Sequence, residues 1–192
     1  DPLPRAGDGP PLPAAVDGHG VRASLGGMGD RIIEAGPNGG IPNHPRWGAL
    51  VRPGAAGPGL GADAGRRLVE ANGWGGSWVW TVFDYHHFHP DAHEALLCIA
   101  GRATIRLGGE EGTDVDVGLG DGMILPAGFG HRMIQAEDGF RVVGAYPPGQ
   151  DSPAVLRARP GEEATFRQEV ALLRRPATDP FTGRDFPGEW AD

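Results

Sequence analysis

Four side chains that could bind one metal ion are spaced along the middle of the chain. Five of the seven histidines lie between positions 86 and 131. If the segment around His87 and His89 is a strand, their side chains share one face, about 6.5–7 Å apart, because alternate strand residues point the same way. Glu94 follows after four residues, a length that suits a tight return toward this pair, and His131 comes after the later turn PAGFG. Three imidazoles and one carboxylate would form a site with open coordination positions, for which the divalent metals Fe, Mn, Ni, Zn and Cu are all candidates.

The same alternation of strand faces predicts which side chains line a pocket around this site. Residues that share the parity of the expected ligands are Thr81, Phe83, Tyr85, Cys98, Met133 and Gln135. Packing alone would explain the aromatic rings and a buried, inert Cys98 thiol, whereas Tyr85 and Gln135 could orient a substrate. His86 and His93 are expected to pack around the ligands without binding the ion. Arg132, next to His131, could recognise a carboxylate.

The elements that must position these side chains are predicted to be short strands. Segments rich in apolar, aromatic and β-branched residues span 77–89, 94–100, 103–107, 115–117, 122–125, 131–135 and 140–146. Each is bounded by Gly, Asp or Pro, and no helices lie between them, which favours an antiparallel sandwich or barrel over a parallel α/β fold. Helices are expected from Asp63 to Gly73 and over 162–175, where apolar residues recur at helical spacing.

Two spaced motifs resemble those of the cupin superfamily. The first cupin motif has HxH, three or four residues, Glu, six residues and Gly, and it is matched by His87, His89, Glu94 and Gly101. The second has Gly, five residues, ProxGly, two residues, His, three residues and Asn, and it is matched by Gly120, Pro126, Gly128 and His131. Thr81 stands where the first motif has a leading Gly, and Gln135 stands where the second ends in Asn. Both departures lie outside the expected ligands.

Further sequence segments, among them IPNHPRWGALV, GAYPPGQ and DPFTG, are similar to those of the YjlB-like bacterial cupins. The resemblance implies an all-β fold, the cupin jelly-roll β-barrel (double-stranded β-helix) with short flanking helices. It also implies a bound transition metal and a homodimer. It implies little about the substrate, because function in such folds depends on the side chains of the site.

The chain has 192 residues, enough for one domain. Its 34 glycines and 19 prolines are concentrated toward the N-terminus. We therefore expect a Gly/Pro-rich arm over 1–62 packed on the barrel, the cupin barrel over 63–160, and a C-terminal helix and tail over 161–192.

The composition excludes several classes of function. All 17 basic residues are arginine, so a Schiff-base lysine and a lysine-containing phosphate loop are ruled out. A formal charge of −8 opposes binding to nucleic acid or to an anionic membrane. No apolar run is long enough to span a membrane. The single cysteine cannot form an internal disulfide, so the cytoplasm is the expected compartment.

These observations favour a metal-dependent enzyme that acts on a small polar molecule, with an Fe(II) dioxygenase-type reaction as the first hypothesis. A metal-dependent isomerase or lyase is the second hypothesis, and oxygen dependence would separate the two. A non-catalytic protein that binds or senses a small molecule is the third. An intact metabolite retained stoichiometrically on purification would favour it.

Overall fold

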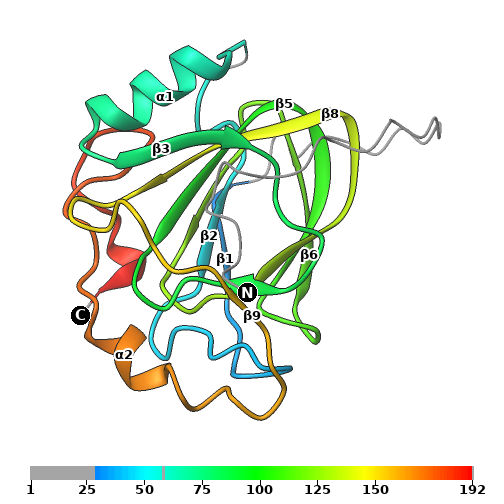
Figure 1. Cartoon of the computed structure of the whole chain (residues 1–192). Helices are drawn as coiled ribbons and strands as arrows, with labels where there is room; N and C mark the ends of the chain where they lie inside the picture. Colours follow the sequence, from blue (N-terminus) through cyan, green and yellow to red (C-terminus); the bar gives the residue numbers. More distant parts are fainter. Residues whose placement is uncertain (1–28, 58, 192) are drawn as a thin grey trace.

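The computed structural model describes residues 29–57 and 59–191, which form one antiparallel sheet with few helices (Figure 1). In chain order the elements are β1 (Arg31–Ile33), β2 (Ala49–Arg52), α1 (Ala62–Ala71), β3 (Gly75–Trp80), β4 (His87–Phe88), β5 (Glu94–Leu107), β6 (Thr113–Gly118), β7 (Gly122–Leu125), β8 (His131–Tyr146), β9 (Leu156–Arg157), α2 (Arg167–Leu172) and a 3-10 helix, Gly188–Trp190. The predicted all-β, jelly-roll class is confirmed.

Two long strands organise the sheet. β5 and β8 pair from Ala95 opposite Ala145 to Leu107 opposite His131. The order across the sheet is β1-β2-β7-β5-β8-β4-β9, with β3 also paired to β8 and β6 also paired to β5. Because the neighbours of β5 and β8 change partway along these strands, the sheet curls over on itself and encloses a core (Figure 1).

The two long strands pass through positions where the sequence predicts breaks. Gly101 has a φ of +61°, and a side chain there would collide with the carbonyl oxygen of Glu137. The ladder between β5 and β8 shifts register on both sides of Ala100. The glycine therefore produces a bulge that bends a continuous strand, and the strand does not end there.

The single strand predicted over 77–89 is wrong, because β3 and β4 are separated by residues 81–86. Trp80 pairs with Val142, and His87 pairs with His131. Trp80 and His87 are seven positions apart, whereas their partners Val142 and His131 are eleven positions apart. One uninterrupted antiparallel ladder therefore cannot contain both pairs. The chain leaves the ladder after β3 and returns to β8 at β4.

Alternate residues of β5 face two apolar layers. Leu96 and Cys98 point into the inner core, which is enclosed by the curled sheet. Leu97 and Ile99 face outward, toward a second cluster formed with α1 and the C-terminal segment. Gly65 lets α1 lie close to the sheet, since a side chain there would come within 3.2 Å of Ile99. Burial on both faces explains why this part of β5 is a nearly continuous apolar run.

Two strands lie within the segment assigned to the arm. β1 pairs with β2, and β2 pairs in turn with β7. Leu50 and Val51 are buried, so the apolar residues of this segment are covered on both faces of the sheet. Residues 1–28 of the assigned arm lie outside the described residues.

The two predicted helices differ in how much of their length forms. The first corresponds to α1, whereas only residues 167–172 of the predicted 162–175 are helical. The Glu163 carboxylate accepts hydrogen bonds from the backbone N–H groups of Gly40 and Gly161, which holds the preceding residues in a turn. Leu173 is extended and ends the helix. No helix in the described ranges is long and apolar enough to cross a membrane.

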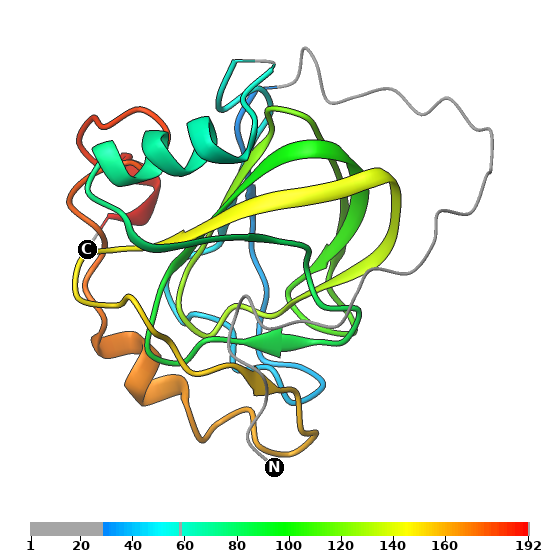
Figure 2. The ribbon, with the colours of Figure 1, turned by 45° about the horizontal axis from the view of Figure 1, so that its top comes forward.

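An aromatic cluster closes the outer layer where the C-terminal segment meets the barrel. Figure 2 shows this segment, in red, beside α1. The Trp190 ring stacks on Trp47 with centroids 5.3 Å apart, and Trp47 stacks on His44 at 4.3 Å. His93 packs against both tryptophans; its Nε2 lies 2.9 Å from the Arg174 carbonyl oxygen, and its Nδ1 accepts from the Ala127 N–H. His93 therefore joins the C-terminal segment to the barrel as a neutral imidazole.

The His93 environment predicts acid sensitivity of the fold. Burial lowers the pKa of His93 from 6.5 to about 4. Between these two values the unfolded chain takes up a proton at this residue that the folded protein does not. The contribution of neutral His93 to stability is therefore complete above pH 6.5 and is lost as the pH falls toward 4. We expect His93 to account for a loss of about 3 kcal/mol in the free energy of unfolding. Urea unfolding of the metal-free protein across this range measures the loss, and His93→Gln should reduce the slope of stability against pH, leaving the part that other buried histidines such as His44 contribute. An unchanged slope in the variant would contradict this role.

Candidate metal centre

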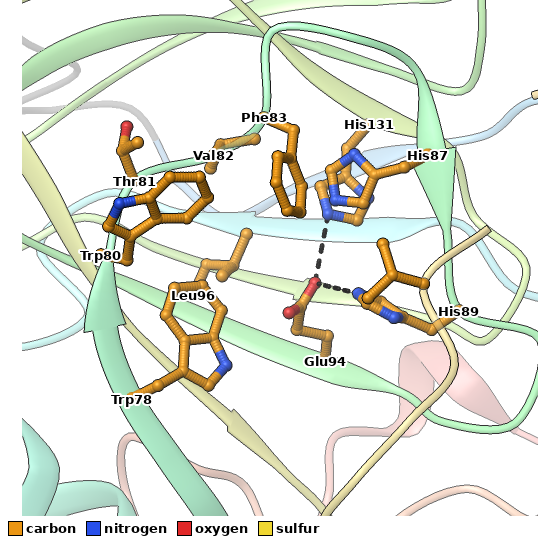
Figure 3. Close-up of a pocket in the computed structure, with 11 residues that line it drawn as sticks. Trp78, Trp80, Thr81, Val82, Phe83, His87, His89, Glu94, Leu96 and His131 are labelled. Carbon is orange, nitrogen blue, oxygen red and sulfur yellow. Dashed lines mark ion pairs between the residues drawn. The ribbon is translucent and has the colours of Figure 1, made fainter. Parts of the chain in front are cut away.

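Three histidines converge at one end of the inner core. His87 and His131 are directly paired across β4 and β8, so their side chains share a face. His89 is two residues beyond His87 and points the same way. One ring nitrogen from each of the three lies within 4.8 Å of the others, and all three side chains are buried (Figure 3).

Glu94, the first residue of β5, brings a carboxylate to the three imidazoles. Its Oε2 lies 3.3 Å from Nε2 of His89 and 3.2 Å from Nε2 of His131 (Figure 3). The residues 90–93 return the chain from β4 to β5, as their number suggested. The structure thus brings together all four side chains that the sequence predicts as metal ligands.

The second ring nitrogen of each histidine faces a backbone carbonyl oxygen. Nδ1 lies 3.2 Å from the Tyr85 oxygen in His87, 2.8 Å from the Ala154 oxygen in His89, and 3.3 Å from the Phe129 oxygen in His131. A carbonyl oxygen can only accept a hydrogen bond, so each of these contacts favours the tautomer that carries its proton on Nδ1. In that tautomer the lone pair of Nε2 is free to bind an ion. Metal-binding histidines are commonly oriented in this way.

The four clustered side chains shift one another's pKa values. Burial, reinforced by the charges of His131 and His89, holds the pKa of His87 well below its usual value. Burial alone would raise the pKa of Glu94, but the adjacent His89 and His131 lower it well below the ordinary range. Glu94 in turn raises the pKa of His89 against the effect of burial. The Glu94 carboxylate thus favours a proton on His89, which a bound metal ion would displace.

Two buried atoms of the cluster lack a hydrogen-bond partner. They are Nε2 of His89 and Oε2 of Glu94. A buried polar atom without a partner costs about 1–3 kcal/mol. A cation between these atoms would satisfy both, and three nitrogens with one oxygen suit a divalent transition metal. The residues present therefore fit the metal that the sequence motifs imply.

A small, mostly apolar cavity adjoins the cluster. Its volume is about 20 Å³, room for an ion or a single water molecule. Besides the four clustered side chains, the lining consists of Trp78, Trp80, Thr81, Val82, Phe83, Leu96 and Val155 (Figure 3).

Of the six side chains predicted to line a pocket, Thr81 and Phe83 do so. Tyr85 lies just outside, stacked on Phe83 with centroids 4.7 Å apart. Cys98 lies farther along β5 in the apolar core, and burial raises the pKa of its thiol to about 12. Met133 packs against the same core.

Gln135 is exposed, and its amide donates to the Thr104 hydroxyl. Strand alternation predicted that Gln135 faces the pocket, and this prediction fails because the pairing of β5 with β8 shifts register between Thr104 and Ile105. These two adjacent residues of β5 pair with Gln135 and Met133, so an extra residue of β8 lies between the pairs. One extra residue in a strand reverses the faces of those beyond it.

The three residues expected to pack around the ligands lie elsewhere. His86 points away from the cluster, with Nε2 3.1 Å from a Glu110 carboxylate oxygen. Arg132 reaches the same carboxylate at 3.8 Å. His93 belongs to the aromatic cluster of Trp47 and Trp190. None of these three lines the cavity.

Tyr146 is a neighbour of the cluster that the sequence analysis missed. Ala95 pairs with Ala145, so the next position along the ladder sets Tyr146 opposite Glu94. Its hydroxyl accepts a hydrogen bond from Trp78 Nε1 at 2.8 Å. Burial and the charge of Glu94 raise the pKa of Tyr146, so it stays protonated. No motif links positions 94 and 146, and only the pairing of β5 with β8 brings them together.

Comparison with known proteins identifies a curated sequence relative and distant solved structures. The relative is "Uncharacterized protein YjlB" of Bacillus subtilis (strain 168), 36% identical over 152 residues, which cover 78% of this chain and 88% of that protein. No protein-family model matches the chain.

The solved structures that match include enzymes. The 3,4-ketoisomerase QdtA from Thermoanaerobacterium thermosaccharolyticum is 20% identical with a TM-score of 0.34, over 42% of this chain and 62% of that one. Streptomyces albus HEPD, with 2-hydroxyethylphosphonate and Fe(II) bound, is 12% identical with a TM-score of 0.31, over 70% of this chain and 23% of that one. The chain thus spans less than two thirds of either structure. Both TM-scores are below 0.5, and we transfer no property from these proteins.

Proposed function

This chain belongs to the YjlB-like family of the cupin superfamily, and from that premise we propose that it is a metal-dependent enzyme acting on a small polar molecule. We further propose that the metal is Fe(II) and that the reaction is of the dioxygenase type. Three histidines and one carboxylate leave coordination positions open for a substrate and for oxygen.

The observation that carries the proposal is the set of ring nitrogens aimed at one point. His87, His89 and His131 each direct Nδ1 to a backbone carbonyl, and their ligand atoms lie within 4.8 Å of one another. A packing role alone would not require three imidazoles with converging ring nitrogens, or a buried imidazole nitrogen and a buried carboxylate oxygen without hydrogen-bond partners.

The residues of the chain have separate parts in this function. His87, His89 and His131 would hold the ion through Nε2, and Glu94 would supply the fourth ligand and offset its charge. When bound, the ion supplies Lewis acidity and redox chemistry. The apolar cavity walls keep bulk water from the site, which strengthens electrostatic interactions inside it.

The cavity volume limits what can enter. About 20 Å³ admits a group of very few atoms unless side chains move. The site therefore fits the reacting end of a small molecule better than a polymer.

Oxygen consumption tests the reaction type. Iron-loaded protein is mixed with a panel of small organic acids, alcohols and thiols, and an oxygen electrode is read alongside NMR of the mixture. We expect at least one compound to disappear together with oxygen, and the signal to be lost in Glu94→Ala but kept in Gln135→Ala, whose side chain lies outside the cavity. Conversion that proceeds without oxygen would contradict the dioxygenase proposal and favour an isomerase or lyase. An intact metabolite that stays bound and is never converted would favour a binding protein.

We also propose a cytoplasmic location and a homodimer, with a small molecule as the ligand. The compartment is supported by the lone cysteine, and the assembly by the resemblance to cupins.

A further inference from the structure

Arg157 is placed beside the metal cluster by its strand. Within β9 it pairs directly with His87 of β4, so the two side chains lie on the same face of the sheet. Val155, two residues earlier, lines the cavity. Arg157 itself is exposed and is not a lining residue, but its guanidinium lies over the ring of Tyr85, which stacks on the lining residue Phe83.

An aromatic row holds this guanidinium in position. The central carbon of the Arg157 guanidinium lies 3.5 Å above the Tyr85 ring. Tyr85 stacks on Phe83, and Phe83 meets the His87 ring edge-on at 5.0 Å. Stacking of arginine on an aromatic face limits its motion and leaves its N–H groups at the rim available to a ligand. The row therefore runs from a fixed cation to a predicted metal ligand.

The charge at this point has no carboxylate partner. Among the ion pairs of the described residues, none includes Arg157. Asp84 is exposed next to Tyr85, and its charge acts on that ring without pairing with the guanidinium. In a protein of net charge −8, one unpaired guanidinium matches a singly charged carboxylate better than a doubly charged phosphate.

We propose that Arg157, seated on Tyr85, binds the carboxylate of a small organic acid whose other end enters the cavity. This inference rests on the proposed function, because it names the substrate class of the same site. The small cavity volume supports this proposal, because the carboxylate would stay outside at Arg157 and only the reacting group would have to enter the cavity.

Binding of lactate and its uncharged analogue lactamide tests the inference without requiring turnover. The two probes are titrated by NMR into metal-free and zinc-loaded protein. We expect lactate to bind about tenfold more tightly than lactamide to both forms, the size of one charge-assisted contact. Arg157→Gln should abolish this preference, and Arg157→Lys should retain part of it. Arg67→Gln, an exposed arginine of α1, is the matched control and should retain all of it.

Equal binding of the two probes by the unaltered protein, no binding of either, or a preference that survives Arg157→Gln would overturn the inference. Elemental analysis of the same samples separates this failure from failure of the proposed function. If the protein contains metal but does not prefer lactate over lactamide, only the proposed carboxylate subsite is wrong. If the preference for lactate depends on Arg157 but the protein cannot be loaded with metal, only the proposal of a metal-dependent enzyme is wrong.

Discussion

The double variant His87→Ala, His131→Ala is expected to lose its bound transition metal, whereas the unaltered protein carries nearly one equivalent. These two side chains are a direct pair across β4 and β8, with ring centroids 4.0 Å apart. Removing both leaves only His89 and Glu94, too few ligands to retain a divalent ion of this kind. Elemental analysis by mass spectrometry of the purified proteins, before and after reconstitution, measures the loss.

A matched control exists one position away. His86 adjoins His87 in sequence but points to Glu110, so His86→Ala should keep the metal. Thermal melts of all samples show whether the double variant remains folded. Iron or manganese in the unaltered protein would support the dioxygenase proposal. No metal even after reconstitution would overturn it and favour a metal-independent binding protein.

Trp190→Ala is expected to destabilise the fold by about 3–5 kcal/mol, the usual cost of removing a fully buried large aromatic side chain. Trp190 is 0% exposed. Its ring stacks on Trp47, and its Nε1 donates to the Gly48 carbonyl oxygen at 2.9 Å. Substitution opens a cavity between the C-terminal segment and the barrel and leaves that carbonyl without its partner. Urea unfolding followed by tryptophan fluorescence and circular dichroism gives the difference in free energy.

Leu172→Ala is the control for this experiment. Leu172 is a large apolar residue near the same segment but is 83% exposed, so its loss should change stability by less than about 0.5 kcal/mol. If Trp190→Ala costs no more than Leu172→Ala, the aromatic cluster does not hold the C-terminal segment to the barrel.

The sequence by itself determined the class of fold and the set of residues that meet at the centre. Short apolar runs bounded by Gly, Asp and Pro, without intervening helices, indicate an antiparallel barrel. Strand alternation aligns His87 with His89, and the short return to Glu94 needs no long-range information. The two cupin motifs add His131. These inferences depend only on local geometry, namely the alternation of side chains along a regular strand and the length of a short connection.

The tertiary structure decided what depends on register between distant strands. The bulge in the β5–β8 ladder turns Gln135 out to solvent, and the same ladder sets Tyr146 opposite Glu94. Likewise, pairing of β4 with β9 brings Arg157 beside His87. A register is set by the packing of whole strands, and a shift of one residue exchanges the two faces. For this reason the ligands could be predicted from spacing, whereas the neighbours that tune them and the rim of the cavity could not.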